Sequence, residues 1–276
     1  MSRDRNALLD GLVEASIAAG AAIMAIYDSD FAVTMKQDSS PVTEADAAGE
    51  AIILEALARL SPDVPVVAEE EAAAGRIPDT DGHFYLVDPL DGTKEFVGRN
   101  GDFTVNIALI ESHAPSLGVV FAPVERRIFV GDVQCGVAWT ASVGENGTIG
   151  PRHALRIRAV PIEGLAAVAS RSHNSPATEA YLDQFKVASR VTRGSSLKIC
   201  MVACGQADLY PRLAPTMEWD IAAGDAVLRA AGGLLTAPDG NAMPYGKPGF
   251  FNIGFVAAGG LQAPPIQSFL TGGQER

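Results

Sequence analysis

The chain has 276 residues, and 47% of them are hydrophobic, which is enough to bury a substantial core as one large domain or as two closely packed halves. The formal net charge of −12 argues against a nucleic-acid polymer or an anionic membrane as the main partner, because phosphate backbones attract clustered Lys and Arg. A small anionic ligand remains compatible with this charge, since bound divalent cations can reverse the local field of carboxylates.

The cysteines and the lengths of the apolar runs indicate the cellular compartment of the protein. Cys135, Cys200 and Cys204 form no disulfide framework, and no charged-then-apolar leader opens the sequence. No apolar run reaches the roughly 20 residues of a spanning helix. We therefore expect a cytoplasmic protein without a transmembrane segment, with peripheral attachment to the inner face of the membrane left open. Cys200 and Cys204 lack further Cys or His to complete a tetrahedral metal site, so we interpret them as packing residues.

The first half combines helices with an antiparallel sheet. Its apolar patterns predict a helix over about residues 6–27, a strand over 31–35, a helix that begins near Thr43, and strands over 64–68, 83–87, 103–110, 116–121 and 127–130. Asp46 lies three residues after Thr43, where it suits the first turn of a helix. Residues 141–151 are rich in Gly, Asn, Ser and Thr, which indicates an exposed loop.

The second half alternates strands and helices, which is typical of an α/β unit. The predicted elements are strands over 165–169, 187–191, 207–210, 234–236 and 253–257, and helices over 177–185, 196–204, 221–231 and 261–270. Asp220 occupies the expected N-cap of the third of these helices. We place a soft boundary near residue 150, which gives halves 1–150 and 151–276.

The central feature is the stretch that follows the apolar run 83–87. It places Asp88 and Asp91 three residues apart at a strand end, with Pro89 restricting the backbone between them. Carboxylates held in this way suit Mg²⁺, and Gly92 and Thr93 begin a turn or helix whose N–H groups can hold a phosphate. A solvated Asp-Pro-Gly turn is the alternative. Glu69 and Asp220, which lie at the ends of other predicted elements, favour the metal site.

These motifs resemble a known phosphatase family. The set Thr43-Glu44-Ala45-Asp46, Glu69-Glu70, Asp88-Pro89-Leu90-Asp91-Gly92-Thr93 and Trp219-Asp220 is similar to the lithium-sensitive, magnesium-dependent inositol monophosphatase superfamily. Within it, the segments 91–96, 100–110, 170–173, 194–198 and 210–212 resemble the CysQ branch of 3′(2′),5′-bisphosphate nucleotidases. One departure is Ala68, where many members have Ser or Gly.

The resemblance implies an α-β-α-β-α layered sandwich, in the α+β or α/β class, and a set of site residues. Two or three Mg²⁺ ions are expected on Glu69, Asp88, the Leu90 carbonyl, Asp91 and Asp220. Asp46 and Thr93, with Glu69, are expected to position or deprotonate the attacking water. Substrate contacts are expected from Gly92, Thr93, Ser170, His173, Ser195, Lys198 and Asp220. From the sequence alone, Lys198 can equally be an exposed lysine at a helix start, and His173 a structural histidine.

The leading hypothesis is Mg²⁺-dependent hydrolysis of adenosine 3′,5′-bisphosphate to AMP and phosphate, which removes a by-product of sulfate activation. An inositol monophosphatase or sugar-phosphate phosphatase with the same metal core is the enzymatic alternative. A catalytically inactive, metal-binding interaction module is an alternative of another class, which the full set of carboxylates disfavours. The expected partner is a small nucleotide bisphosphate, and the chain is expected to act as a monomer or homodimer.

Overall fold

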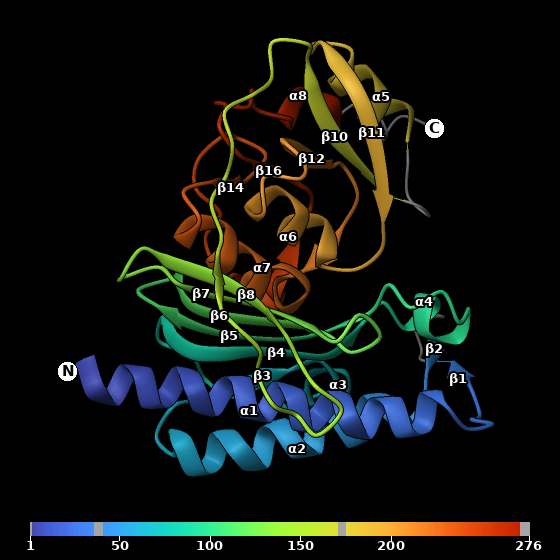
Figure 1. The fold of residues 1–276 in the computed structure, drawn as a ribbon, viewed down its shortest axis with the longest axis vertical. Helices are drawn as coiled ribbons and strands as arrows, with labels where there is room; N and C mark the ends of the chain where they lie inside the picture. The colour runs from blue at the N-terminus through green and yellow to red at the C-terminus, as the bar shows by residue number, and fades with distance from the viewer. Residues whose placement is uncertain (1, 36–40, 171–174, 271–276) are drawn as a thin grey trace.

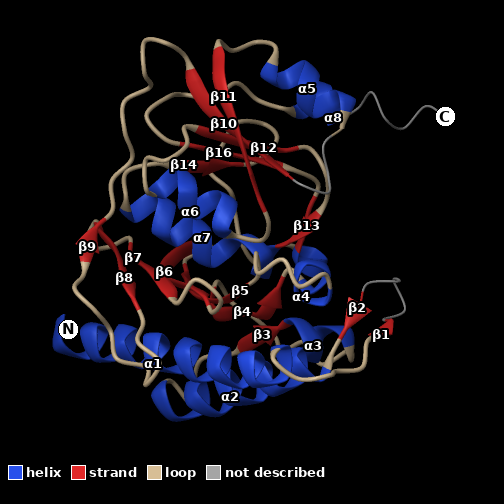
Figure 2. Cartoon of the chain, turned by 45° about the vertical axis from the view of Figure 1, so that its right-hand side comes forward, coloured by secondary structure: helices blue, strands red, loops and turns tan. Residues whose placement is uncertain are grey.

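The computed structural model describes residues 2–35, 41–170 and 175–270, and its elements stack in five layers (Figures 1 and 2). Helices α1 (Ser2–Tyr27) and α2 (Glu44–Leu60) form the first layer, and a seven-stranded sheet forms the second. Helices α6 (Leu197–Ala203) and α7 (Glu218–Ala230) separate this sheet from a five-stranded sheet, beyond which lie α5 (Pro176–Leu182) and α8 (Gln267–Leu270). The expected α-β-α-β-α sandwich is confirmed.

The first sheet contains the strand that carries the central motif. Its order is β3 (Val66–Ala68), β4 (His83–Asp91), β5 (Thr104–Glu111), β6 (Ala114–Ala122), β7 (Arg127–Asp132), β8 (Val137–Ser142) and β9 (His153–Ala154). β3 pairs with β4 in parallel, and the other pairs are antiparallel. The loop predicted from residue 141 begins too early, because Ala141 is buried and pairs with Ile128 within the sheet.

The second sheet follows after residue 154. Its order is β11 (Val187–Arg193), β10 (Leu165–Ser170), β12 (Leu209–Arg212), β16 (Phe255–Ala258) and β14 (Leu234–Thr236). β10 runs parallel to β11 and β12, whereas β16 is antiparallel to its two neighbours. The last helix, α8, is much shorter than the predicted 261–270. The division at residue 150 stays a prediction, and β9 still pairs with the first sheet beyond it.

Several short elements complete the fold, and some of them border the cleft described below. They are α3 (Glu69–Ala73), α4 (Thr93–Val97), the antiparallel pairs β1 (Thr34–Met35) with β2 (Pro41–Val42) and β13 (Thr216–Met217) with β15 (Phe251–Asn252), and the 3₁₀ turn Pro248–Phe250. Of these elements, α3, α4, β13 and β15 supply residues to the cleft.

Helix α7 belongs to the second half by sequence but packs against the first sheet. Two glycines of that sheet make the close approach possible. A Cβ at Gly118 would lie 2.4 Å from the Ala223 carbonyl oxygen, and one at Gly131 would lie 2.6 Å from the Ala226 carbonyl oxygen. Larger residues would push α7 away from the sheet. The glycines therefore fix the distance between α7 and the strands that carry the central motif.

The start of α7 differs from the prediction. The helix begins at Glu218, so Asp220 is its third residue and not its N-cap. The Asp220 carboxylate accepts a hydrogen bond from the Met217 backbone N–H at 2.9 Å. A carboxylate at this position can satisfy a free backbone donor before the helix, as the N3 residue of a capping box does. The N-cap prediction was wrong because Asp is favoured both at the N-cap and at the third position of a helix, so its presence does not distinguish the two.

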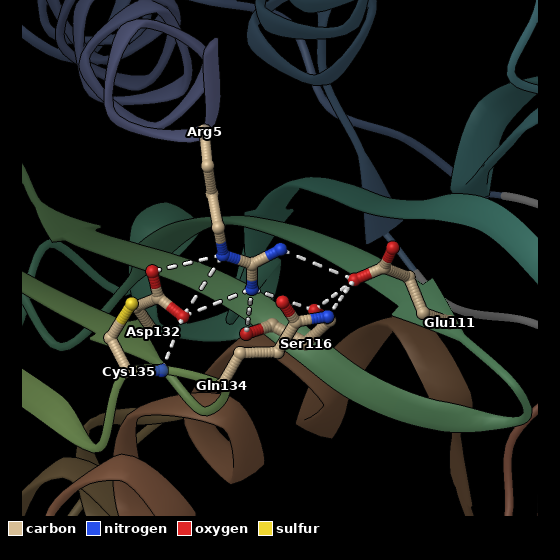
Figure 3. Close-up of polar contacts among 6 residues, drawn as sticks. All are labelled: Arg5, Glu111, Ser116, Asp132, Gln134 and Cys135. Atoms are coloured by element: carbon tan, nitrogen blue, oxygen red, sulfur yellow. Dashed lines mark hydrogen bonds and ion pairs between the residues drawn. The ribbon is translucent and has the colours of Figure 1, made fainter. Parts of the chain in front are cut away.

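The N-terminal end of α1 is attached to the first sheet by one guanidinium group (Figure 3). Arg5 donates to both carboxylate oxygens of Asp132, to Ser116 and to Glu111, while the Cys135 backbone N–H also donates to Asp132. Burial alone would raise the pKa of Asp132, but these hydrogen bonds hold it below its usual value. The contact therefore joins the first helix to β7.

Helix α1 is also long and apolar enough to cross a membrane, judged by length and composition alone. This is the one such candidate within the described part of the chain, and it corrects the expectation that no apolar stretch is long enough. Core helices pass the same test. Leu12, Val13, Ala19 and Ile23 of α1 are buried in a hydrophobic core shared with α2 and the sheet, which accounts for the apolar residues of α1 without a membrane.

Candidate active site

A cavity of about 420 Å³ lies where the ends of first-half elements meet α6, α7 and the β13–β15 pair. Its charged lining consists of the acidic residues Glu69, Asp91, Glu95 and Asp220 and the basic residues Lys94, Lys198 and Arg212. Gly92, Thr93, Ser195 and Ser196 add hydroxyl or backbone groups. One wall is apolar, with Ile221, Phe251 and Phe255 among its residues. The two halves thus bring most of the predicted site residues to one cavity.

The end of β4 carries two carboxylates, of which Asp91 lines the cavity and Asp88 is buried without lining it. The pairing of β4 with β5 shifts between Asp88 and Asp91, so the strand is irregular where it carries them. Asp88 is 1% exposed, and one of its oxygens accepts the Leu90 backbone N–H at 3.0 Å. Burial raises the pKa of Asp88 well above its usual value, and repulsion from Glu69, Asp91 and Asp220 adds to this effect. These four side chains therefore form one electrostatic group.

The donor chemistry of this group fits a hard divalent cation. All four side chains offer carboxylate oxygens, the ligands that Mg²⁺ prefers. The pKa of Asp220 is likewise raised by burial and by Asp91 and Glu69, although the bond from Met217 N–H opposes the shift. Among the described residues, no three acidic, His or Cys side chains already have the closed geometry of a metal site. The buried negative charge is what a bound cation would stabilise; the ligand assignment stays a prediction.

Gly92 and Thr93 connect β4 to α4. Gly92 has φ = 98°, a left-handed conformation that Gly adopts at little cost, and a Cβ there would lie 3.1 Å from the Asp102 carbonyl oxygen. Thr93 Oγ1 lies 3.2 Å from Asp46 Oδ1 and 3.3 Å from the Leu90 carbonyl oxygen. The single proton of the Thr93 hydroxyl is shared between these two acceptor oxygens. The Leu90 carbonyl, a predicted metal ligand, is thus next to the predicted water-positioning pair.

Asp46 is held by the start of its own helix. The backbone N–H and hydroxyl of Thr43 donate to Asp46 Oδ2 at 2.8 and 2.9 Å, and the Thr43 hydroxyl accepts the Ala45 N–H. The helix start predicted from Thr43 and Asp46 is confirmed as a capping box. Because one oxygen of Asp46 is used by the cap, the other is directed to Thr93.

The segment before α6 contacts Asp91 from the opposite side of the cleft. Ser195 Oγ and the Ser196 N–H both donate to Asp91 Oδ2 at 2.6 Å. Thr104 Oγ1 lies 2.5 Å from Ser195 Oγ and 2.8 Å from Ser196 Oγ, and Ser196 also donates to Asn106. Ser195 has a positive φ of 54°, which is uncommon for Ser. Ser195 therefore contacts a predicted metal ligand in addition to its predicted role at the substrate.

Lys198 is buried, not exposed, so the interpretation as an ordinary surface lysine is wrong. It is 7% exposed on α6, and its ammonium nitrogen lies 5.6 Å from the centre of the Tyr210 ring. Burial lowers the pKa of Lys198 to about 8, although Asp91 attracts the charged form. Arg212, at the end of β12, donates to the carbonyl oxygens of Ala214 and Pro215. Lys198 and Arg212 therefore add two cationic side chains from the second half to the cavity that contains Asp91.

Three acidic residues near the cleft received no role from the sequence. Burial raises the pKa of Glu95, which lines the cavity. Asp102 accepts the Gly194 N–H at 2.8 Å and an Arg193 N–H at 2.7 Å, and so joins the end of β11 to the first half. Glu50 on α2 is 4% exposed, and burial raises its pKa to about 7. Glu95 and Asp102 lie inside the quoted motifs, which could have drawn attention to them.

Two predicted substrate contacts are not tested. His173 lies outside the described residues, and Ser170 is known only as the last residue of β10. Cys200 is buried in the core between the sheets, which agrees with a packing role.

The model of the inositol monophosphatase family matches residues 4–263. The chain belongs to the inositol monophosphatase family. Within this family it is 43% identical over 251 residues to the 3′(2′),5′-bisphosphate nucleotidase CysQ of Salmonella typhimurium, covering 90% of this chain and 98% of the relative. It is 37% identical over 256 residues to the protein of the same name from Buchnera aphidicola, covering 91% and 93%.

Solved structures of the family support the same placement. CysQ from Bacteroides thetaiotaomicron aligns with a TM-score of 0.75 at 33% identity, over 92% of this chain and 97% of that one. An inositol monophosphatase from Anabaena aligns with a TM-score of 0.72 at 26% identity, over 95% and 98% of the two chains. The fold is therefore the inositol monophosphatase-like fold that the motifs imply.

Proposed function

We propose that this protein is a Mg²⁺-dependent 3′(2′),5′-bisphosphate nucleotidase that hydrolyses adenosine 3′,5′-bisphosphate to AMP and phosphate. The observation that carries the substrate choice is the buried ammonium of Lys198 in the cavity that also contains Asp91. A second phosphate would pair with this cation in addition to the carboxylates of Asp91 and Glu95, whereas a monophosphate offers it no such further partner. The 43% identity to a relative named as a bisphosphate nucleotidase supports the same choice.

The negative charge of the phosphate sets the main requirement of this reaction. A dianionic phosphate repels both the carboxylates of the site and the attacking oxygen, so cations must offset that charge. In our proposal, Glu69, Asp88, the Leu90 carbonyl, Asp91 and Asp220 hold two or three Mg²⁺ ions. When bound, these ions supply positive charge to the attacking and leaving oxygens of the ester. The Gly92 and Thr93 amides hold the reacting phosphate in line.

Asp46 and Thr93 orient the water in this mechanism. The Thr93 hydroxyl donates a hydrogen bond to Asp46 Oδ1, which leaves a lone pair on Thr93 Oγ1 to accept a hydrogen bond from the water. As the water oxygen bonds to phosphorus, one proton of the water passes to Thr93 while the Thr93 proton passes to Asp46. The bond from phosphorus to the ribose oxygen breaks, the ribose oxygen takes a proton from solvent water and leaves as a hydroxyl, and Asp46 returns its proton to solvent. Glu69 holds the same water from the opposite side. The reaction requires no phosphoenzyme.

The second phosphate and the nucleoside are bound by the second half. Lys198 pairs with the second phosphate, and Arg212 supports it from the end of β12. Ser170, His173, Ser195 and Asp220 complete the substrate contacts. We further propose that the enzyme acts on this small molecule in the cytoplasm, as a monomer or homodimer.

Phosphate release tests this proposal against its alternatives. The substrates are adenosine 3′,5′-bisphosphate and inositol 1-phosphate at equal low concentrations, each with Mg²⁺ and with EDTA. We expect Mg²⁺-dependent release with a strong preference for the nucleotide. A preference for the inositol ester would retain the metal mechanism and reject the substrate. If neither substrate releases phosphate, the alternative of an inactive metal-binding module is favoured.

A further inference from the structure

Helix α3 begins without a cap of its own. Its first residue is Glu69, and the preceding Ala68 provides no side-chain acceptor for the free N–H groups of the first turn. Two of those N–H groups donate instead to a side chain of another helix, α2. Glu50 Oε2 accepts the Glu70 N–H at 2.8 Å, and Glu50 Oε1 accepts the Glu71 N–H at 3.0 Å. The position of α3 is therefore tied to α2.

The bond to Glu50 has an electrostatic cost. Glu50 is nearly fully buried, and the neighbouring carboxylates of Glu70 and Glu71 oppose its negative charge. A polar, uncharged residue at this position would avoid that cost. A carboxylate differs from an amide in one respect that matters here: both of its oxygens accept, so it can hold two consecutive N–H groups at once.

Helix α2 thereby connects two parts of the site. Asp46 and Glu50 are four residues apart and lie on the same face of α2. Asp46 contacts Thr93 in α4, and Glu50 holds the backbone directly after Glu69 in α3. Glu69 in turn lies close enough to Asp88 for its negative charge to raise the pKa of Asp88. A shift of α3 along α2 would move Glu69 away from Asp88.

We propose that Glu50 is a positioning residue, which sets the place of the predicted ligand Glu69 by holding the first turn of α3 against α2. This inference rests on the proposed metal-dependent function. Glu50 itself is not among the residues that line the cavity. Groups that orient metal ligands in this way typically change metal affinity by about 10–100-fold when they are replaced.

The test compares Mg²⁺ binding in the full chain and its variants Glu50→Gln, Glu50→Asp and Glu55→Gln. Glu55 is on the same helix with a side chain that is 74% exposed, so it is the matched control. The readout is the rise in thermal midpoint as MgCl₂ is added at pH 8, where the Glu50 carboxyl is mostly ionised. We expect Glu50→Gln to need about 10–100-fold more Mg²⁺ for half of the full rise, and Glu55→Gln to match the wild type.

Two further measurements separate positioning from general stability. In EDTA, Glu50→Gln is expected to melt within about 4 °C of the wild type, because the change removes a buried charge as well as one hydrogen bond. At saturating Mg²⁺, its kcat is expected to recover to within about threefold of the wild type, as an affinity effect requires. An unchanged Mg²⁺ midpoint in Glu50→Gln would overturn the proposal.

If Glu50→Gln fails to fold, the variant Glu50→Asp still tests the proposal. Glu50→Asp retains both acceptor oxygens on a shorter side chain, so we expect a smaller increase in the Mg²⁺ midpoint in the same direction. A wild-type midpoint in this variant would overturn the proposal. If Mg²⁺ does not stabilise the wild type at all, the proposed metal site fails, and that failure is visible before any variant is compared.

Discussion

Thr93 Oγ1 in α4 lies 3.2 Å from Asp46 Oδ1 in α2, so the first turns of two separate helices meet beside the end of β4. Replacing Thr93 with Val keeps the shape of the side chain but removes the hydroxyl. We expect kcat to fall by about 10²–10⁴-fold, the usual contribution of a positioned proton-transfer group, with a nearly unchanged Mg²⁺ midpoint. Steady-state phosphate release at saturating Mg²⁺ measures the effect. Thr93→Ser, which restores a hydroxyl, is expected to recover most of the activity.

Asp88→Asn should separate stability from activity. The change removes one negative charge from a buried carboxylate group, so we expect the thermal midpoint in EDTA to equal or exceed that of the wild type. With Mg²⁺ present, the wild type should gain stability and the variant should gain little. Turnover should fall on the order of 10³-fold on every phosphate ester. Thermal melts with and without Mg²⁺, together with phosphate release, check both parts. A variant with near-normal Mg²⁺-dependent turnover would contradict the metal assignment.

Lys198 gives the proposed reaction a characteristic pH dependence. Its lowered pKa of about 8 means that the free enzyme loses this positive charge as the pH rises through that value. We therefore expect kcat/KM for adenosine 3′,5′-bisphosphate to fall above about pH 8, whereas inositol 1-phosphate shows no such loss.

The variant Lys198→Met tests the assignment of this pH dependence. We expect it to lower kcat/KM for the bisphosphate by about 10–100-fold, the typical value of a hydrogen bond to a charged group, and to remove the alkaline loss. Paired pH profiles on the two substrates measure both effects. An equal loss on both substrates would assign Lys198 a general electrostatic role.

The contact between Arg5 and Asp132 supports stability rather than catalysis. Arg5→Met leaves the nearly buried Asp132 carboxylate without its cation, so we expect the free energy of unfolding at pH 7 to fall by about 3 kcal/mol with kcat unchanged. Because the pKa of Asp132 is lowered in the folded protein, this stabilisation is complete above the ordinary pKa of 3.8 and is lost as the pH falls below it. Urea unfolding across this pH range measures it. Arg59→Met, at an exposed ion pair with Glu55, is the control and should cost less than about 1 kcal/mol.

Local patterns in the sequence account for much of the fold and for half of the site. The capping box of Thr43 and Asp46 and the strand that ends at Asp88 depend on residues only a few positions apart, so their spacing reveals them. The layered architecture followed from family motifs along most of the chain. The predicted start of α7 was displaced by three residues, because an acidic residue is favourable at both the N-cap and the third helical position.

Contacts between distant residues could not be predicted in the same way. Ser195 and Asp91 are 104 positions apart, and nothing near either residue indicates their hydrogen bond. The burial of Lys198 depends on how α6 packs between the two sheets. Glu50 carries no local signal because its partners belong to another helix, 20 and 21 residues later. Such roles arise from tertiary packing, which a single sequence does not specify locally.

Gly118 and Gly131, which pack against α7, have a consequence for folding during synthesis of the chain. A ribosome synthesises the seven-stranded sheet before it reaches residues 218–230, so the face of that sheet around Gly118 and Gly131 is without its helix until those residues have been made. Until then the apolar strands of the nascent chain have no native cover on that side, and Asp220 does not yet exist. Synthesis of α7 therefore closes the core and completes the predicted ligand set in a single step, so a chain that stops before α7 has neither.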